Sequence, residues 1–387
     1  MENIIGKKTK HKDNYSYLSL HDFPSKDFKT AIDDILIRKA NNAQFLLGKL
    51  SGITLLLPNL DFFINSYMMK DAAASSQIEG TQATMLDAFE YSADPINARE
   101  NDADDITHYL AALNYGLTRL KDENFPLSLR FIRELHEKLM SKARSTHFSD
   151  PGEFRKSQNW IGGTLPSNAS FVPPTPEELP KALNDLERFI HNPFLHPILD
   201  AGLLHAQFET IHPFLDGNGR TGRLLIIFYL IENKYLDVPA LFLSSYFMKY
   251  KKIYYERLDN YHNGDVFSWL DFFIDGVINT AEEAIEIATE ITKQRNIDLE
   301  LISSFTKKTS DTAMIILNEL YKNPIVSSSS IQKWIGQTRQ GTNSFINILM
   351  NAGLISLFRK GKGSKPSLYI HSKYIMIFYD KHVQIED

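Results

Sequence analysis

The stretch IHPFLDGNGRTGRLL, residues 211–225, decides how this chain is interpreted, because it gathers one histidine, one aspartate, one asparagine and two arginines around three glycines and then becomes apolar. Gly217 and Gly219 permit backbone conformations in which successive N–H groups point into one concavity. The helix expected from about Arg220 adds free N–H groups and the positive end of its dipole. The sequence therefore predicts an anion site where a loop enters a helix.

The polar side chains of this stretch indicate what that site can do. Arg220 and Arg223 are three residues apart, so both could reach an anion from one helix face. The Asp216 carboxylate suits Mg²⁺, which favours carboxylate and phosphate oxygens. His212 ends the preceding helix, and a neutral imidazole suits a general base near pH 7. Each residue alone would more often be an ordinary turn or surface residue, but together they predict a polyphosphate site with a metal ligand and a base.

HPFLDGNGRTGR, residues 212–223, resembles the signature of the Fic family, His-x-Phe-x-(Asp/Glu)-Gly-Asn-Gly-Arg-x-x-Arg, with every fixed position filled. Residues 50–90 are similar to the N-terminal region of that family, and residues 151–163 and 171–179 are similar to the stretch that holds its flap. The resemblance implies a mainly α protein with the Fic helical fold and a β-hairpin flap. It also implies transfer of AMP from ATP to a Ser, Thr or Tyr hydroxyl of a target protein, or of the chain itself, with release of pyrophosphate.

The resemblance assigns roles to individual residues. His212 would deprotonate the target hydroxyl, and Asp216 would hold Mg²⁺ between the α- and β-phosphates. The ATP-binding set would be Glu79, Asp216, Gly217, Asn218, Gly219, Arg220, Thr221, Gly222, Arg223, Tyr254 and Tyr255, with Arg223 on the γ-phosphate. The two tyrosines would line the adenine pocket or, equally well, only pack an aromatic face. The flap would include Ile161, Gly162, Gly163 and Thr164.

Position 219 bears on the reaction type. Doc-like kinases of this family carry a lysine where Gly219 stands, so Gly219 favours AMP transfer over phosphate transfer. Phosphocholine transfer stays open.

SSQIEG, residues 75–80, resembles the inhibitory motif of the family, (Ser/Thr)-x-x-x-Glu-(Gly/Asn), through Ser75, Glu79 and Gly80. The resemblance implies that Glu79 pairs with Arg223 and so blocks the γ-phosphate, because a carboxylate then occupies an anion site. The alternative is a solvated glutamate at a helix end. In some relatives the same glutamate supports removal of AMP, so Glu79 could serve both directions.

The bulk composition fits a soluble globular protein of more than one domain. The 387 residues are 43% hydrophobic and 23% charged, and the chain has no cysteine, which excludes disulfides and thiolate metal sites. The N-terminus has no apolar core of a signal peptide, and the longest apolar run, residues 224–231, is too short to cross a bilayer. We expect a cytoplasmic protein without a membrane segment.

Apolar residues at helical spacing predict that most of the chain is helical. The expected helices are 42–57, 61–80 with Gly80 as C-cap, 106–120, 127–140, 175–191 with a cap at Thr175, and 200–212 ending before Pro213. Residues 160–174 predict a hairpin or flap. We expect three units: an N-terminal helical region with the inhibitory motif (1–105), a catalytic core (106–300) and a C-terminal domain (305–387).

The C-terminal domain carries a separate charge signal. Residues 320–379 contain no acidic residue and eight basic ones, Lys322, Lys333, Arg339, Arg359, Lys360, Lys362, Lys365 and Lys373. Three expected helices followed by a lysine-rich hairpin predict a winged helix-turn-helix. Such a unit could bind DNA, which makes a DNA-binding regulator with a Fic sensor domain the competing function, or it could serve as a homodimer or target-docking surface.

Overall fold

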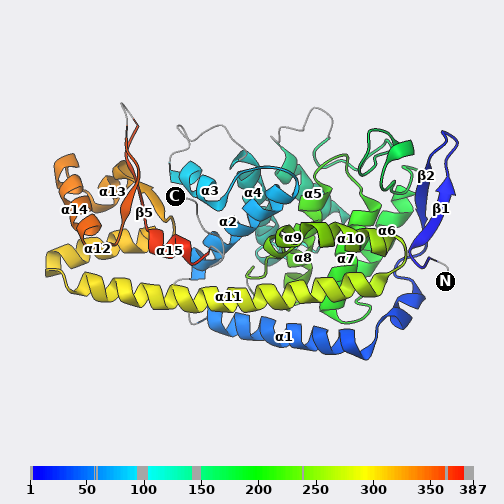
Figure 1. The fold of residues 1–387 in the computed structure, drawn as a ribbon, viewed down its shortest axis with the longest axis horizontal. Helices are drawn as coiled ribbons and strands as arrows, with labels where there is room; N and C mark the ends of the chain where they lie inside the picture. The colour runs from blue at the N-terminus through cyan, green and yellow to red at the C-terminus, as the bar shows by residue number, and fades with distance from the viewer. Residues whose placement is uncertain are drawn as a thin grey trace.

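The computed structural model describes residues 3–55, 57, 60–93, 103–141, 150–237, 239–361 and 365–378, and these are mainly helical, as the sequence predicts. The long helix α11 (Val266–Ser303) runs along the molecule with α1 (Asp34–Thr54) beside it (Figure 1). Asp33 starts α1, because its carboxylate accepts from the N–H groups of Ile35 and Leu36. The two helices pack along one another and support part of the helical bundle that lies between them in the sequence.

The central bundle consists of helices between α1 and α11. They are α2 (Leu60–Ile78), α3 (Met85–Ala93), α4 (Ala103–Lys121), α5 (Leu129–Met140), α6 (Leu179–His191), α7 (Pro197–Ile211), α8 (Asn218–Glu232), α9 (Ser244–Lys249) and α10 (Lys251–His262). Nearly every residue of α7 and α8 is buried, and a helix that is apolar on all sides belongs in a core. The loop between these two helices, residues 212–217, therefore lies on a rigid support.

Three features of the N-terminal and flap regions differ from the sequence prediction. Strands β1 (Gly6–Lys10) and β2 (Ser16–Leu20) form an unexpected antiparallel hairpin at the end of the molecule opposite the C-terminal helices (Figure 1). A short 3₁₀ helix, η1 (Lys26–Ala31), links the hairpin to α1. Residues 160–174 do not form paired strands. They make one antiparallel bridge, Ile161 with Phe171, around the 3₁₀ turn η2 (Pro166–Asn168), because the two glycines and the proline interrupt pairing.

The start of α6 also departs from expectation. Glu178, not Thr175, occupies the N-cap, and no side chain caps the helix. Thr175 precedes a proline, which disfavours helical backbone there, and its carbonyl accepts from the N–H groups of Glu178 and Leu179 in a turn. The predicted end of α7 is confirmed, because the helix stops at Ile211 before His212 and Pro213.

The C-terminal unit consists of α12 (Lys307–Leu320), β3 (Ile325–Ser327), α13 (Ser328–Ile335), α14 (Arg339–Asn351), β4 (Ser356–Arg359), β5 (Leu368–Ile370) and α15 (Ser372–Met376). Its three strands form an antiparallel sheet in the order β3-β5-β4. Lys362 and residues 379–387 of the expected domain lie outside the described residues.

Buried polar contacts join the C-terminal unit to the bundle. The carboxylate of Asp298 on α11 accepts from the Tyr321 hydroxyl at 2.7 Å and from Nε2 of His371 at 2.8 Å. The hydroxyls of Ser66 on α2 and Tyr374 on α15 are 2.9 Å apart. The unit is thus anchored both to the long helix and to the helix that carries the expected inhibitory motif. None of the helices in the described ranges is both long and apolar enough to cross a membrane.

Candidate active site

His212 follows the last turn of α7 in a left-handed conformation, with φ 49° and ψ 60°. Its carbonyl accepts from Nε of Arg155 at 2.9 Å and from the side-chain amide of Asn159 at 3.0 Å. The His212 carbonyl has no helical N–H to accept from once the chain leaves α7, and these two side chains satisfy it instead, so the sharp turn leaves no buried carbonyl unpaired there. Burial lowers the pKa of Arg155 to about 10, so its guanidinium stays cationic near neutral pH.

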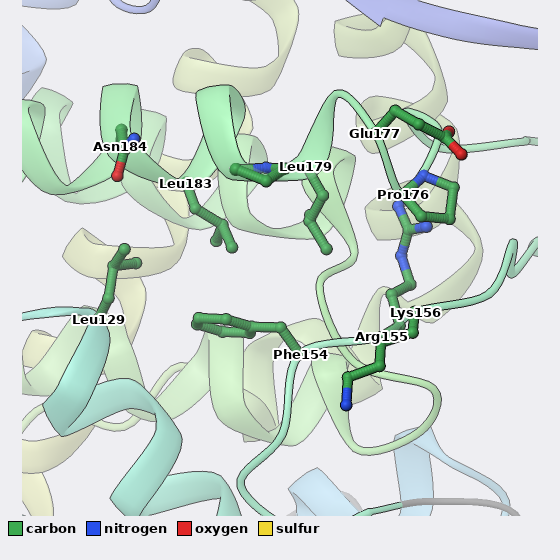
Figure 2. Close-up of a pocket in the computed structure, with 10 residues that line it drawn as sticks. Leu129, Phe154, Arg155, Lys156, Pro176, Glu177, Leu179, Leu183 and Asn184 are labelled. Atoms are coloured by element: carbon green, nitrogen blue, oxygen red, sulfur yellow. The ribbon is translucent and has the colours of Figure 1, made fainter.

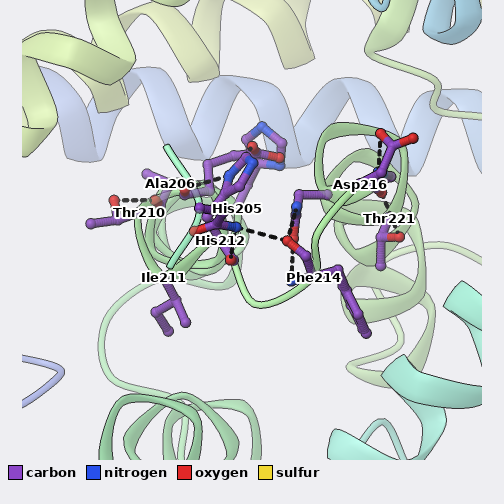
Figure 3. Close-up of polar contacts among 12 residues, drawn as sticks. His205, Ala206, Thr210, Ile211, His212, Phe214, Asp216 and Thr221 are labelled. Atoms are coloured by element: carbon purple, nitrogen blue, oxygen red, sulfur yellow. Dashed lines mark hydrogen bonds and ion pairs between the residues drawn. The ribbon is translucent and has the colours of Figure 1, made fainter. Parts of the chain in front are cut away.

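The loop after His212 is held from within by the first turns of α8. The Asn218 side chain accepts from the N–H of Phe214 at 2.9 Å and donates to its carbonyl at 2.8 Å. The Thr221 hydroxyl donates to the carbonyl of Gly217, whose φ of 75° lies in the left-handed region. Figure 3 shows His212 and Asp216 at opposite ends of this loop, with Thr221 on the helix beyond. Asn218 and Thr221 thus hold the loop of residues 212–217 from its buried side.

His136 on α5 supports the same loop, and nothing in the sequence pattern distinguished it. Its ring stacks on Phe214 with centroids 3.7 Å apart, and its Nδ1 accepts from the N–H of Gly152 at 2.9 Å. The proton must then sit on Nε2, which donates to the carbonyl of Asp216 at 3.0 Å. Burial lowers the pKa of His136 to about 4, so the ring is neutral and fixed in this tautomer.

Arg223 faces the end of α2, where the structure brings the predicted inhibitory residues to it. Nε of Arg223 donates to the Ser75 hydroxyl at 2.9 Å, and NH2 donates to the Ser75 carbonyl at 3.0 Å and to the Glu79 carboxylate at 2.7 Å. Burial alone would lower the pKa of Arg223, but the adjacent Glu79 raises it above its usual value. Gly80, with φ +101°, follows the end of the helix, as expected for a C-cap region.

Gly219 lies directly against Glu79. A Cβ atom at position 219 would be 2.3 Å from Oε1 of Glu79, so any larger residue would displace that carboxylate. The absence of a side chain at 219 therefore matters to the Glu79–Arg223 pair.

Arg220 does not share the direction of Arg223, contrary to the expectation that both reach an anion from one face. Its guanidinium is buried, 3.5 Å from the Asp105 carboxylate on α4 and 3.6 Å from the sulfur of Met140 on α5. Gly222 also faces the interior, where a Cβ atom would be 2.4 Å from Oε1 of Glu209. A separation of three residues turns the helix by about 300°, so the two arginines diverge enough to meet different neighbours.

Asp216 is the one predicted metal ligand. Its Oδ1 accepts from the N–H of Gly217 at 2.6 Å, and its side chain is partly exposed. The described residues contain no group of three or more acidic or histidine side chains placed to hold a metal ion. Mg²⁺ that is bound by one carboxylate and substrate phosphates needs no such cage, so Asp216 fits that mode of binding.

A cavity of about 720 Å³ opens beside His212 and contains part of the predicted site. Its walls include Glu79, Gly219 and Arg223, the tyrosines Tyr254 and Tyr255, and the flap residues Trp160, Ile161, Gly162 and Phe171. Ser75, Gly80, Gly163, Thr164, Asp216, Gly217, Asn218, Arg220, Thr221 and Gly222 do not line it. The cavity thus combines a base, a cation and aromatic walls at one place.

The two tyrosines have different surroundings. Tyr254 is buried, its hydroxyl lies 2.9 Å from Nε2 of His205, and its ring stacks on Phe247. Tyr255 is 45% exposed at the rim. Tyr254 therefore belongs to the aromatic core while one side meets the cavity, whereas Tyr255 lies at the cavity rim with its hydroxyl 3.5 Å from the Ile78 carbonyl.

The flap is shaped by its glycines and by Asn168. A Cβ at Gly162 or Gly163, both with φ near +70°, would lie within 2.6 Å of Ser170 or Asn168 atoms. The Asn168 carboxamide accepts from the N–H groups of Thr164 and Leu165. Gly163 and Thr164 thus form the turn of the flap, and Ile161 and Gly162 face the cavity.

Burial sets the ionisation of the cavity side chains. It lowers the pKa of His212 to about 4 and that of His262 to about 3. The same burial raises the pKa of Glu209 to about 8. The sequence prediction did not include Glu209 or His262. Glu209 lines the cavity because it lies one turn before His212, and His262 lines it because α10 ends there.

A second hollow of about 500 Å³ lies between α5 and α6, where Leu129, Phe154, Leu179 and Leu183 face one another (Figure 2). Arg155, Pro176 and Glu177 lie at one end of it. None of the residues predicted for ATP or metal binding lines this hollow, so it is not the candidate active site.

Comparison with known proteins relates the chain to one family. Residues 126–230 match the Fic/DOC family, and residues 37–118 match the Fic/DOC family N-terminal region. A protein adenylyltransferase Fic of Aedes aegypti is 29% identical over 187 residues, which are 47% of this chain and 34% of that protein. The Drosophila ananassae protein of the same name is 31% identical over 159 residues, 40% of this chain and 28% of its own length. The chain thus spans about a third of the curated relatives it matches.

Solved structures share the fold. A Fic family protein from Desulfovibrio desulfuricans G20 superposes with a TM-score of 0.57 at 18% identity, over 88% of this chain and 96% of that one. A Fic domain containing signaling protein from Bacteroides thetaiotaomicron gives a TM-score of 0.52 at 22% identity, over 64% and 97% of the two chains.

Proposed function

We propose that this chain, which carries a Fic/DOC domain at residues 126–230, is a protein adenylyltransferase that moves AMP from ATP to a protein hydroxyl. The observation that carries the proposal is the cavity in which His212, Gly219 and Arg223 meet under the flap. The name of the Aedes and Drosophila relatives supports the same reaction. Phosphate transfer is disfavoured, because Gly219 stands where Doc-like kinases of the family carry a lysine.

His212 has the geometry of a general base. Its Nδ1 lies 3.2 Å from the backbone carbonyl of Glu209, so Nδ1 carries the proton that donates there and Nε2 keeps its lone pair. With a pKa near 4 the ring is neutral at pH 7. Nε2 takes the proton of the target hydroxyl while that oxygen bonds to the α-phosphorus. The bond from the α-phosphorus to the bridging oxygen breaks, and pyrophosphate leaves with the electron pair.

The start of α8 supplies the anion site for the phosphates. Free N–H groups of the first turn and the helix dipole favour negative charge, and the loop is fixed by Asn218, Thr221 and His136. Asp216 would hold Mg²⁺, which supplies charge neutralisation on the phosphates when bound. Tyr255 and the flap residue Ile161 would contact the adenine.

Glu79 is the proposed inhibitor of this reaction. Its carboxylate occupies Arg223, the side chain proposed to hold the γ-phosphate, and Ser75 fixes the same guanidinium. ATP must then displace a charge-assisted hydrogen bond before it binds in a productive position.

Labelling with two forms of ATP tests the function. Purified protein is incubated with Mg²⁺, a cytosolic extract and ATP labelled at either the α- or the γ-phosphate. AMP transfer puts α-label on protein bands and no γ-label, because pyrophosphate leaves. Protein bands that take up label from γ-labelled ATP but none from α-labelled ATP would indicate phosphate transfer and contradict the proposal. Loss of α-label from a premodified target would favour the reverse reaction, removal of AMP, at the same site.

A second function is favoured by the C-terminal unit. Its order of helices and strands and its sheet order β3-β5-β4 support the proposal that this unit is a winged helix-turn-helix, with α14 as its recognition helix. Lys333, Arg339, Lys360, Lys365 and Lys373 are exposed in a window free of acidic residues. We propose that this surface binds duplex DNA. A gel shift of labelled duplex by the whole chain should weaken steeply with salt and should weaken again in Arg339→Ala. Binding unaffected by either change would refute this role.

A further inference from the structure

Glu209 is a buried carboxyl of the cavity to which the proposed reaction gives no task. It lies on α7 one turn before His212, and its side chain is 9% exposed. Its Oε2 is 3.9 Å from Nδ1 of His212. Its Oε1 is buried and has no hydrogen-bond partner within the described part of the chain. A buried oxygen in this state costs stability, so packing alone does not account for a glutamate at this position.

The neighbours of Glu209 hold its carboxyl near the base. Oε1 lies against Gly222, where even a Cβ atom would approach to 2.4 Å, so the α8 backbone limits how far the side chain can move. The charged and titratable groups around it are Glu79 beyond α2, Arg223 on α8, Tyr254 and Tyr255 on α10, His205 on its own helix and His212 just after that helix. His212 is the one of these that must change charge during transfer.

We propose that Glu209 is the positioning residue of the base, and that its carboxylate offsets the positive charge of the His212 ring. This inference rests on the proposed function. When Nε2 takes the hydroxyl proton, the ring becomes imidazolium with protons on both nitrogens. The Nδ1 side then faces the Glu209 carbonyl at 3.2 Å and its carboxylate at 3.9 Å. An anion at that distance in a buried site stabilises the cation and strengthens the base.

The proposal predicts a dependence on pH. Burial raises the pKa of Glu209 to about 8, and the Glu79 charge adds to that rise while Arg223 opposes it. The neighbouring histidines, His205 and His212, have pKa values lowered by burial to about 3 and about 4, and burial raises the pKa of Tyr255 to about 12. Only the ionised carboxyl helps the base, so transfer should rise with pH as Glu209 ionises. Removal of Glu79 should move this rise to lower pH.

The first test uses the proposed uninhibited protein, Glu79→Gly, in which transfer is fast enough to follow. Adding Glu209→Gln keeps the volume and removes the charge. We expect kcat to fall about tenfold, the KM for ATP to stay within about twofold, and the rise of kcat with pH to disappear. The matched control is Asp200→Asn, which removes another buried carboxyl of α7 that binds the N–H groups of Phe194 and Leu195 far from His212. The control should keep the rise.

The second test needs no transfer activity. The ring resonances of His212 in histidine-labelled whole protein, assigned by their loss in His212→Gln, should shift with pH as Glu209 ionises. The inflection should vanish in Glu209→Gln and occur at lower pH in Glu79→Gly. An unchanged pH dependence of kcat in the glutamine variant, or an inflection of His212 that persists there, would overturn the proposal. Absence of transfer in every variant would instead refute the proposed function, and the His212 titration would still decide the role of Glu209.

Discussion

Replacement of Glu79 by glycine should raise AMP transfer, because it frees Arg223 for the γ-phosphate. The carboxylate accepts from NH2 of Arg223 at 2.7 Å, and Arg223 is buried while the Glu79 side chain is 36% exposed. Two unit charges about 4 Å apart attract by about 4 kcal/mol at an effective dielectric constant of about 20. Solvent contact of Glu79 reduces this to about 2–3 kcal/mol, which lies within the range of about 1.5–3 kcal/mol for hydrogen bonds to charged groups.

At about 1.4 kcal/mol for each tenfold change, this competition should slow transfer by about 30- to 140-fold. The assay is labelling of targets and of the chain itself by α-labelled ATP, as initial rates at subsaturating ATP. Glu79→Gln should give a smaller gain, because an amide can still accept from Arg223 but carries no charge. Arg223→Ala should cancel the gain.

The matched control is Glu256→Gln, which removes another carboxylate from the wall of the same cavity but whose ion-pair neighbour is Arg257 at 4.0 Å, not Arg223. Its rate should equal that of the wild type. If Glu79→Gly labels no target and not itself faster than wild type, the Glu79–Arg223 pair is a structural contact and the autoinhibition proposal fails.

Three further predictions follow from the site and from the C-terminal contact. His212→Ala should lower transfer about 10²–10⁴-fold while ATP binding by calorimetry stays near wild type, and a wild-type rate would remove His212 from the reaction. Asp216→Ala should abolish the difference in labelling rate between Mg²⁺ and chelator. A wild-type protein that labels equally fast in chelator and in Mg²⁺ would contradict the metal role. Burial would raise the pKa of Asp298, but its hydrogen bonds from His371, Tyr321 and Gln294 outweigh this and lower it. The ionised Asp298 therefore stabilises the fold above its unfolded-state pKa of about 4, and this stabilisation is lost as pH falls through the lowered pKa of the folded state. Thermal melts should show a lower Tm for Asp298→Asn than for wild type at pH 7, and a smaller difference in Tm in acid.

The sequence alone determined the local part of this site. The glycines, Pro213 and the apolar run after residue 223 specify a helix, a tight loop and a second helix, because those preferences act over a few residues. The order of polar residues then placed a histidine before the loop and an arginine one turn into the second helix. The resemblance to a known signature added the link between Glu79 and Arg223, which are 144 residues apart.

Tertiary structure alone decided which side chains face the cavity and which hold the loop. Three residues of the signature face away from the cavity, since a helix presents successive residues to different neighbours. Arg220 faces α4, Thr221 donates to the Gly217 carbonyl, and Gly222 lies against Glu209. The supports of the loop, His136, Arg155 and Asn159, come from two separate segments and carry no local pattern. Their roles arise from long-range packing, in which each buried carbonyl and N–H of the loop must find a partner, and the chain supplies that partner from whichever element the fold brings near.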